Sequence, residues 1–252
     1  RAFLIGDAAH VLPPTGGLGL NAGFQAVHNL MWKLAGVING WADANLLASY
    51  DVERREITQI NAEASFKNNV NAGAIGEAYQ TNGDVAGALR RAESYGRFAG
   101  LDLGARYTRG AFHNDGTTAT PLRETIGFYD RAATPGCRAP HVWLENKDKR
   151  ISSLDLFEDR FCLLAGSNGD DWVNTALELS KEHKIPLAAF AVNHPESTLT
   201  GDSWISEYGI SQSGAILVRP DGHIGFRQAT DAGNCRAALS QGLAACIGRT
   251  SL

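Results

Sequence analysis

The stretch Gly6-Asp7-Ala8-Ala9-His10, followed by Pro13-Pro14-Thr15-Gly16-Gly17-Leu18-Gly19-Leu20-Asn21, decides the fold of this chain. The apolar residues Ala2–Ile5 before it predict a short buried strand that ends at Gly6. Asp7 would then stand at the carboxyl end of that strand, where α/β proteins place residues that contact ligands. A helix is predicted to begin near Asn21, after a loop rich in glycine and proline.

The loop has the chemistry of a ligand-binding segment. Its glycines let a ligand approach the backbone closely, and the first amides of the following helix are unpaired and partly positive. We therefore expect an electron-rich or anionic group against the helix start. Each piece is weak alone: a Gly-Asp after a strand is most often a turn, and His10 alone is most simply a structural loop histidine. Gly17-x-Gly19 also lacks the third glycine of the dinucleotide-binding fingerprint.

The order of strand, Gly-Asp, Pro-Pro, glycine-rich loop and helix resembles the second FAD-binding motif of the class A flavoprotein aromatic hydroxylases. That family includes phenol hydroxylase and the polyketide hydroxylases. The resemblance continues over Gly23–Ala35, although Ala26 stands where the family usually has Asp, and it returns in Leu47-x-x-Tyr50-x-x-Glu53-Arg54-Arg55. We interpret Glu53, Arg54 and Arg55 as a structural ion-pair cluster rather than as catalytic residues.

The resemblance implies FAD as cofactor, NADH or NADPH as co-substrate, and hydroxylation of a small phenolic or polyketide substrate through a flavin C4a-hydroperoxide. It implies that Asp7 hydrogen-bonds the ribityl chain, that the backbone of Gly19–Asn21 lies against the pyrimidine edge of the flavin, and that Pro14 borders the oxygen site. The candidate cofactor-binding residues are Asp7, Pro14, Gly17, Gly19, Leu20 and Asn21. The sequence identifies no secure catalytic residue and no metal site.

The expected fold class is α/β, in two parts. Residues 1–120 resemble the end of an FAD-binding, glutathione-reductase-like domain with helices, residues 121–137 a linker, and residues 138–252 a thioredoxin-like α/β domain. The G-x-G-x-x-G loop that holds the pyrophosphate in the family is absent. We therefore expect a carboxyl-terminal portion whose FAD site is completed by an amino-terminal half, and which is inactive alone.

Periodicity predicts the elements of the first part. In the first helix, apolar residues recur at spacings of three and four, and Asn39-Gly40 is a suitable stop. These residues are Phe24, Val27, Met31, Leu34 and Ile38. A second helix is expected from about Asn45, interrupted at Gly73 and Gly76, and a third over Asp84–Arg97 with Asp84 as its cap. The alternation over Ala105–Phe112 predicts a strand.

The second part is predicted to be strand, helix, strand, then a hairpin and a last helix, which is the thioredoxin-like arrangement. The expected strands are 161–165, 187–192, 215–219 and 223–227, and the helices 171–183, 203–208 and 232–247. The larger aromatic hydroxylases carry such a domain, with an ending similar to Arg219–Arg227. A thiol oxidoreductase needs C-x-x-C at the start of its first long helix, and this chain has none there. We therefore expect a scaffold, with Cys162 as a buried small hydrophobe.

Composition limits the partners and the compartment. The net charge of −4 and the lack of a basic run argue against nucleic acid and anionic membranes. No apolar stretch approaches the roughly 20 residues of a membrane span, and no signal peptide opens the chain. The four cysteines have no C-x-x-C spacing, so we expect reduced thiols and a cytoplasmic location.

A second hypothesis stays open beside the hydroxylase. In it, the chain is a non-catalytic binding or assembly module with a vestigial flavin motif, and it uses the thioredoxin-like domain for packing or dimer contacts. Under either hypothesis a homodimer is open. Flavin absorbance after purification distinguishes the two, because only the hydroxylase hypothesis predicts a yellow protein.

Overall fold

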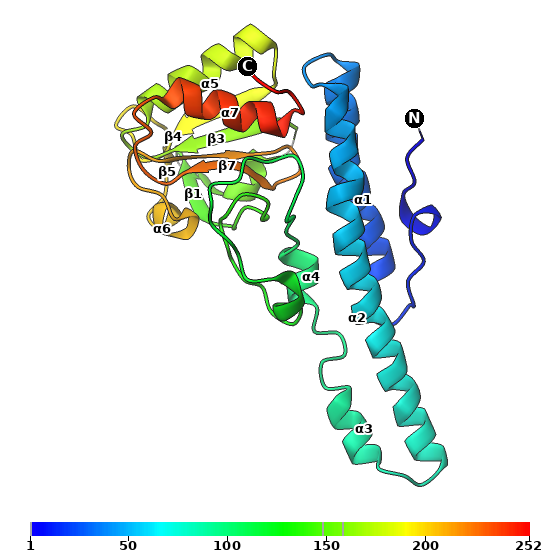
Figure 1. Ribbon diagram of the computed structural model, residues 1–252. Helices are drawn as coiled ribbons and strands as arrows, with labels where there is room; N and C mark the ends of the chain where they lie inside the picture. Colours follow the sequence, from blue (N-terminus) through cyan, green and yellow to red (C-terminus); the bar gives the residue numbers. More distant parts are fainter. Residues whose placement is uncertain (1, 148, 158) are drawn as a thin grey trace. The chain divides into compact units, whose positions relative to one another are not determined.

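The computed structural model describes residues 2–147, 149–157 and 159–252 (Figure 1). Its contacts divide the chain into two compact units. The helical unit contains the chain up to His28, Arg54–Ala105 and Pro121–Asp130, and the sheet unit contains Asn29–Glu53, Arg106–Thr120 and Arg131–Leu252. Helices α1 (Leu18–Ile38) and α2 (Ala48–Gln80) contribute residues to both. The sequence-based boundaries at 120 and 138 stay a prediction.

The helical unit is made of helices joined by short loops. Besides parts of α1 and α2, it contains η1 (Gly6–Ala8), α3 (Val85–Arg91), α4 (Ala99–Leu103) and η3 (Leu122–Glu124). Asp84 caps α3, as the sequence predicts, because its carboxylate accepts a hydrogen bond from the backbone N of Gly87 at 2.8 Å. Its buried apolar residues are Leu18, Ala22, Ala26, Ile57, Ile60, Ala64, Ala88, Phe98, Leu101, Ala105 and Leu122.

The predicted buried strand over Ala2–Ile5 is wrong. Residues 2–5 do not form a strand in the structure, and Leu4 is 60% exposed. A strand needs a neighbour to accept its backbone hydrogen bonds, and apolar character alone does not supply one. The segment is therefore an extended lead into η1.

Helices α1 and α2 also differ from the prediction in their bounds. Helix α1 begins at Leu18 rather than near Asn21, and it ends before Gly40, whose φ of 78° suits the predicted stop. Helix α2 runs through Gly73 and Gly76 without interruption, since an isolated helical glycine costs only about 1 kcal/mol. A short helix η2 (Ala44–Leu47) precedes α2.

The apolar stripe predicted on α1 is largely exposed. Phe24 is 65% exposed and Ile38 is 80% exposed, while Leu30 on another face of the helix is only 1% exposed. The exposed apolar residues at this spacing, called the α1 stripe below, are Leu20, Phe24, Val27, Met31 and Ile38, with the half-buried Leu34 between the last two. The pattern correctly predicted an amphipathic helix but not which of its faces is buried in this chain.

The sheet unit contains a four-stranded sheet of order β4-β3-β6-β7. Strand β3 (Phe161–Ala165) is parallel to β4 (Leu187–Ala191) and antiparallel to β6 (Ala215–Val218), which is antiparallel to β7 (Ile224–Gln228). Helix α5 (Asp170–His183) joins β3 to β4, and α7 (Cys235–Cys246) follows β7. This confirms the predicted order of strand, helix, strand, hairpin and last helix. Helix α6 (Trp204–Tyr208) lies between β5 and β6 in the chain.

A second sheet was not predicted. Strand β1 (Trp143–Asn146) pairs antiparallel with both β2 (Lys149–Ser152) and β5 (Leu199–Thr200). A 3-10 helix, η4 (Ser153–Leu156), follows β2. The strand predicted over Ala105–Phe112 is wrong, because the described structure has an isolated bridge from Arg106 to Cys137 there in place of a strand ladder.

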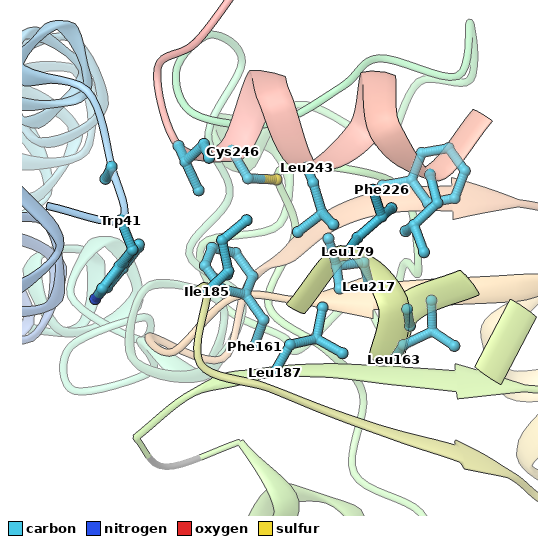
Figure 2. Close-up of a cluster of buried hydrophobic side chains, with 14 of the residues drawn as sticks. Trp41, Phe161, Leu163, Leu179, Ile185, Leu187, Leu217, Phe226, Leu243 and Cys246 are labelled. Carbon is cyan, nitrogen blue, oxygen red and sulfur yellow. The ribbon is translucent and has the colours of Figure 1, made fainter. Parts of the chain in front are cut away.

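Both faces of the four-stranded sheet are buried. Phe161 and Leu163 point to the face covered by α5 and α7, whereas Cys162 and Leu164 point to the opposite face with Trp204. Figure 2 shows Leu243 of α7 above Leu217 and Leu187 of the sheet. A run of five buried residues in β3 is the pattern of a strand covered on both sides.

Residues 29–53 belong to this sheet unit and supply part of its core. Trp32 and Trp41 stack with parallel rings and both meet Phe161 edge to face, at centroid distances of 5.7 and 6.1 Å. The backbone N of Asp43 also donates to Ile247 O at 2.9 Å. The core of the sheet unit therefore extends beyond residues 138–252. In the described part of the chain, no helix is both long and apolar enough to cross a membrane.

Candidate functional site

The predicted ligand loop begins with a tight turn rather than a strand end. Gly6 has a φ of 58°, and its carbonyl oxygen accepts hydrogen bonds from the backbone N of Ala9 and of His10 at 2.8 and 2.9 Å. Asp7 lies in the middle of this turn and is exposed. Its carboxylate makes no hydrogen bond or salt bridge with the described residues, so it is available as an acceptor.

The next segment, Pro13–Gly17, is fastened to α2 by Ser65. The Ser65 hydroxyl lies 2.7 Å from Pro13 O and 2.9 Å from Thr15 O, and the Thr15 hydroxyl donates to Ser65 O at 2.7 Å. Pro14 lies within this fastened segment and accepts from Gly17 N at 3.2 Å. No local sequence pattern points to Ser65, because its partners lie about fifty positions away.

Gly16 and Gly17 have different reasons to be glycine. Gly16 has a φ of 105°, and a Cβ there would lie 2.4 Å from the ring of Phe98, so only glycine fits against that ring. Gly17 has a φ of 69° but open space around it. One glycine therefore packs the loop onto its own unit, and the other leaves the backbone accessible.

Helix α1 then begins with its first turn open. Leu18 is buried and anchors the helix start, while Gly19 has open space where a Cβ would stand, and Leu20 is 73% exposed. The first amides of an α-helix lack an acceptor within the helix and carry partial positive charge. The helix therefore begins three residues before Asn21, near which the sequence predicts its start. Asn21 lies within the first turn, and its amide donates to Asp102 of α4 at 3.4 Å.

The donors and acceptors of this loop fit a group such as FAD. An exposed carboxylate at Asp7 accepts hydrogen bonds from hydroxyls, and open helix amides donate to carbonyl oxygens. The bare backbone at Gly17 and Gly19 admits a flat ring at close range. All six predicted cofactor-binding residues lie in the one continuous segment from η1 to the first turn of α1.

Beneath the turn lie buried nitrogen atoms with no described hydrogen-bond partner. They are Nδ1 and Nε2 of His10 and Nε and Nη1 of Arg54. Burial and the nearby positive charge of Arg54 lower the pKa of His10, which favours a neutral imidazole. Arg54 donates from Nη2 to Ala22 O at 3.4 Å and to Gln25 Oε1 at 3.2 Å. Because these nitrogen atoms are shielded, we assign His10 and Arg54 no direct ligand contact.

The neighbouring carboxylate, Glu53, belongs to the sheet unit and pairs with Lys33 and Arg219, two residues that the predicted ion-pair cluster did not include. This agrees with a structural rather than a catalytic use of Glu53. The thiol of Cys162 is fully buried, and burial raises its pKa, so it stays protonated. Within the described residues, no group of three or more His, Cys, Asp or Glu side chains could hold a metal ion.

Two protein families match separate parts of the chain. Residues 1–65 match the FAD binding domain family, and residues 132–250 match the family described as aromatic-ring hydroxylase, C-terminal. The ligand loop and the Ser65 that fastens it both fall within the first match. Neither match covers half of the chain by itself.

Similar proteins and structures match nearly the whole chain. Tetracenomycin B2 monooxygenase-dioxygenase of Streptomyces olivaceus is 37% identical over 252 residues, covering 99% of this chain and 43% of that protein. The crystal structure of the flavin-dependent monooxygenase PieE in complex with FAD and substrate has a TM-score of 0.87 at 30% identity, covering 99% of this chain and 48% of that one. Aklavinone-11 hydroxylase with FAD and aklavinone has a TM-score of 0.78 at 32% identity, with 99% and 44% covered. The chain spans less than half the length of these three relatives.

Proposed function

We propose that this chain, which belongs to the FAD-dependent aromatic-ring hydroxylases, is the carboxyl-terminal portion of a monooxygenase that acts on an aromatic substrate. The substrate class is phenolic or polyketide, with NADH or NADPH as reductant and O2 as the source of the added oxygen. The observation that carries the proposal is the open loop from Asp7 to Asn21, within the region that matches the FAD binding domain family.

Each loop residue has a role in holding the cofactor. The Asp7 carboxylate accepts hydrogen bonds from the ribityl hydroxyls, and the amides of Gly19, Leu20 and Asn21 face the electron-rich edge of the flavin. Gly17 admits the ring, and Pro14 borders the face where oxygen reacts. FAD, when bound, supplies the redox and oxygen chemistry, while the protein orients it and excludes water.

Ser65 makes this arrangement rigid. A loop held to α2 by the hydrogen bonds of Ser65 with Pro13 and Thr15 presents its backbone in one conformation before the cofactor arrives. The entropy cost of ordering the loop when FAD binds is then smaller, since preorganised groups lose less conformational freedom.

The α1 stripe supports a partner for this chain. Leu20 and Phe24, one turn apart in the helical unit, are 73% and 65% exposed, and exposed apolar residues gathered on one helix face mark an interaction surface. We infer that the amino-terminal half of the FAD-binding domain, with its phosphate-binding loop, covers this stripe. A homodimer through the same stripe is the alternative occupant. The cytoplasmic location expected from the sequence stays a prediction.

The test of the proposal is FAD affinity in the full-length enzyme. Replacing Asp7 by Ala removes a charged acceptor worth about 1.5–3 kcal/mol, so we expect FAD binding to weaken about tenfold or more. Asp202→Ala removes an exposed carboxylate elsewhere and is the matched control. Equal FAD affinities for the wild type and Asp7→Ala, measured by flavin fluorescence titration, would refute the role of Asp7. A protein that is colourless at full length would instead favour the assembly-module hypothesis.

A further inference from the structure

Four charged side chains lie together in the sheet unit, sealed from water. Lys33 of α1, Glu53 of α2 and Arg219 have side chains 0% exposed, and Asp221 is 1% exposed. Arg219 and Asp221 belong to the turn between β6 and β7. With Lys33 protonated, the cluster holds two positive and two negative charges and is neutral, which is the condition under which buried ions are tolerated.

Glu53 is the common acceptor of the cluster. Its Oε1 accepts from Arg219 Nη1 at 2.7 Å and from the backbone N of Ala111 at 2.8 Å. Its Oε2 accepts from Lys33 Nζ at 2.6 Å, from Asn29 Nδ2 at 2.6 Å and from Arg219 Nη2 at 3.1 Å. Glu53 therefore keeps four of its five donors if the charge on Lys33 is lost.

Lys33 is held differently, because its only described hydrogen bond is the one to Glu53. Arg219 also donates to both oxygens of Asp221 and cannot lose its proton in a protein. A lysine ammonium can release its proton when burial disfavours the charge. Lys33 is therefore the member of the cluster that can change the cluster's charge at moderate pH.

The cluster of four charged residues also has other groups packed around it. His223 stacks on Tyr107 and lies with Nδ1 3.6 Å from Asp221 Oδ1, and burial raises the pKa of Cys246 on α7 to about 12. The Trp32 ring lies 5.7 Å from Lys33 Nζ and 5.2 Å from the Arg219 guanidinium, so it senses both cations.

The opposing effects on Lys33 and Glu53 have a physical cause. Burial lowers the pKa of Lys33 to about 8, because the attraction of Glu53 is partly cancelled by the repulsion of Arg219. Burial acts to raise the pKa of Glu53, but the attraction of Arg219 and Lys33 prevails and lowers it to about 2. Glu53 therefore stays ionised while Lys33 titrates.

We propose that Lys33 is a proton switch, which releases its proton inside the folded sheet unit and changes the sealed cluster from neutral to singly negative. The switch rests on the burial and the hydrogen bonds of Lys33, and it is independent of the proposed flavin function. Deprotonation weakens the bond from Lys33 to Glu53 but removes the penalty of a buried ammonium.

The sign of the effect on stability is unusual. In the unfolded chain Lys33 has its ordinary pKa of 10.5, so between about pH 8 and 10.5 the unfolded chain holds a proton that the folded one has released. Stability rises with pH wherever the unfolded state binds more protons. The unfolding equilibrium constant of the wild type should therefore fall about tenfold per pH unit in this range, relative to a variant without Lys33.

The experiment compares the full chain with Lys33→Met, and the matched control is Lys181→Met, which replaces an exposed lysine of α5. In urea unfolding from pH 7 to 10, the free energy of unfolding of the wild type and of Lys181→Met should rise with pH relative to that of Lys33→Met. Tryptophan fluorescence should show a step near pH 8 that Lys33→Met lacks. Parallel stability curves for all three proteins would overturn the proposal.

A second measurement keeps the proposal testable if Lys33→Met does not fold. The carbon-13 shift of lysine Cε reports protonation of each lysine in the folded wild type. One lysine should titrate with a midpoint near pH 8, well below the ordinary value. If every lysine stays protonated to pH 10, Lys33 is not a proton switch.

Discussion

Glu53 and Arg219, 166 positions apart in sequence, form a fully buried bidentate ion pair, with Nη1–Oε1 at 2.7 Å and Nη2–Oε2 at 3.1 Å. The pair joins the first turns of α2 to the turn after β6. Its fork-to-fork geometry explains why the Arg-Pro-Asp-Gly turn needs arginine there, since a lysine cannot make two parallel bonds.

Replacing Glu53 by Gln should destabilise the sheet unit strongly. The change leaves Lys33 and Arg219 buried with only Asp221 to balance them, and breaking a buried pair from one side costs about 3–5 kcal/mol. Glu77→Gln on the same helix, where the side chain is exposed, should change little. Urea unfolding measures both, and a loss below about 1 kcal/mol for Glu53→Gln would contradict the importance of the pair.

The same carboxylate gives a prediction for acid stability. The folded pKa of Glu53 is lowered to about 2 from an ordinary 4.5, so its stabilisation is present above pH 4.5 and lost as pH falls toward 2. Between these values, the free energy of unfolding should fall more steeply in the wild type than in Glu53→Gln. Equal slopes in urea unfolding from pH 5 to 3 would show that Glu53 does not carry this linkage.

The elements of the sheet unit were predictable where one short-range pattern decided them. Sequence patterns predicted strand β3 from its five apolar residues in a row, and helix α5 from the regular spacing of its apolar residues. Both patterns are present because both faces of the sheet are covered within this chain. The sheet formed by β1, β2 and β5 was missed because those strands are short and one of them has only two residues. Pairing across such distances leaves little local signal.

In the candidate site, too, local sequence patterns did not identify the residues that make long-range contacts. The loop from Asp7 to Asn21 was predictable from glycine and proline positions, whereas Ser65, Phe98 and Asp102 touch it from far along the chain. The strand expected over Ala2–Ile5 failed because a strand also depends on its partner, which no periodicity can supply.

Ser65→Ala should loosen the ligand loop without unfolding the chain. Pro13 O and Thr15 O share the one proton of the Ser65 hydroxyl, so the change removes about one hydrogen bond, worth about 0.5–1.5 kcal/mol. Amide hydrogen exchange should speed up around residues 11–20. Thr81→Ala, which removes a similar bond at the far end of α2, is the control. Exchange that is equally slow in Ser65→Ala and the wild type would show that another contact holds the loop.

The four cysteines should differ sharply in reactivity. Cys137, Cys162 and Cys246 are buried and Cys235 is half-buried, and burial raises the pKa of Cys162, Cys235 and Cys246. A colorimetric thiol reagent should therefore label Cys235 first in the native protein and the other three only on unfolding. Cys235→Ser should leave stability unchanged, whereas Cys162→Ser should cost about 1–3 kcal/mol by placing a hydroxyl in an apolar strand. Rapid native labelling of Cys162 would contradict the packing of β3.

The most direct test of the central claim is FAD titration of this chain with and without an amino-terminal segment that carries the phosphate-binding loop. We predict weak or no FAD binding by residues 1–252 alone, because the loop from Asp7 to Asn21 offers only one carboxylate and a few backbone amides to the cofactor. Saturable FAD binding should appear when the segment is supplied, and Asp7→Ala should weaken it about tenfold or more. Tight stoichiometric FAD binding by residues 1–252 alone, or no binding even with the segment present, would contradict it.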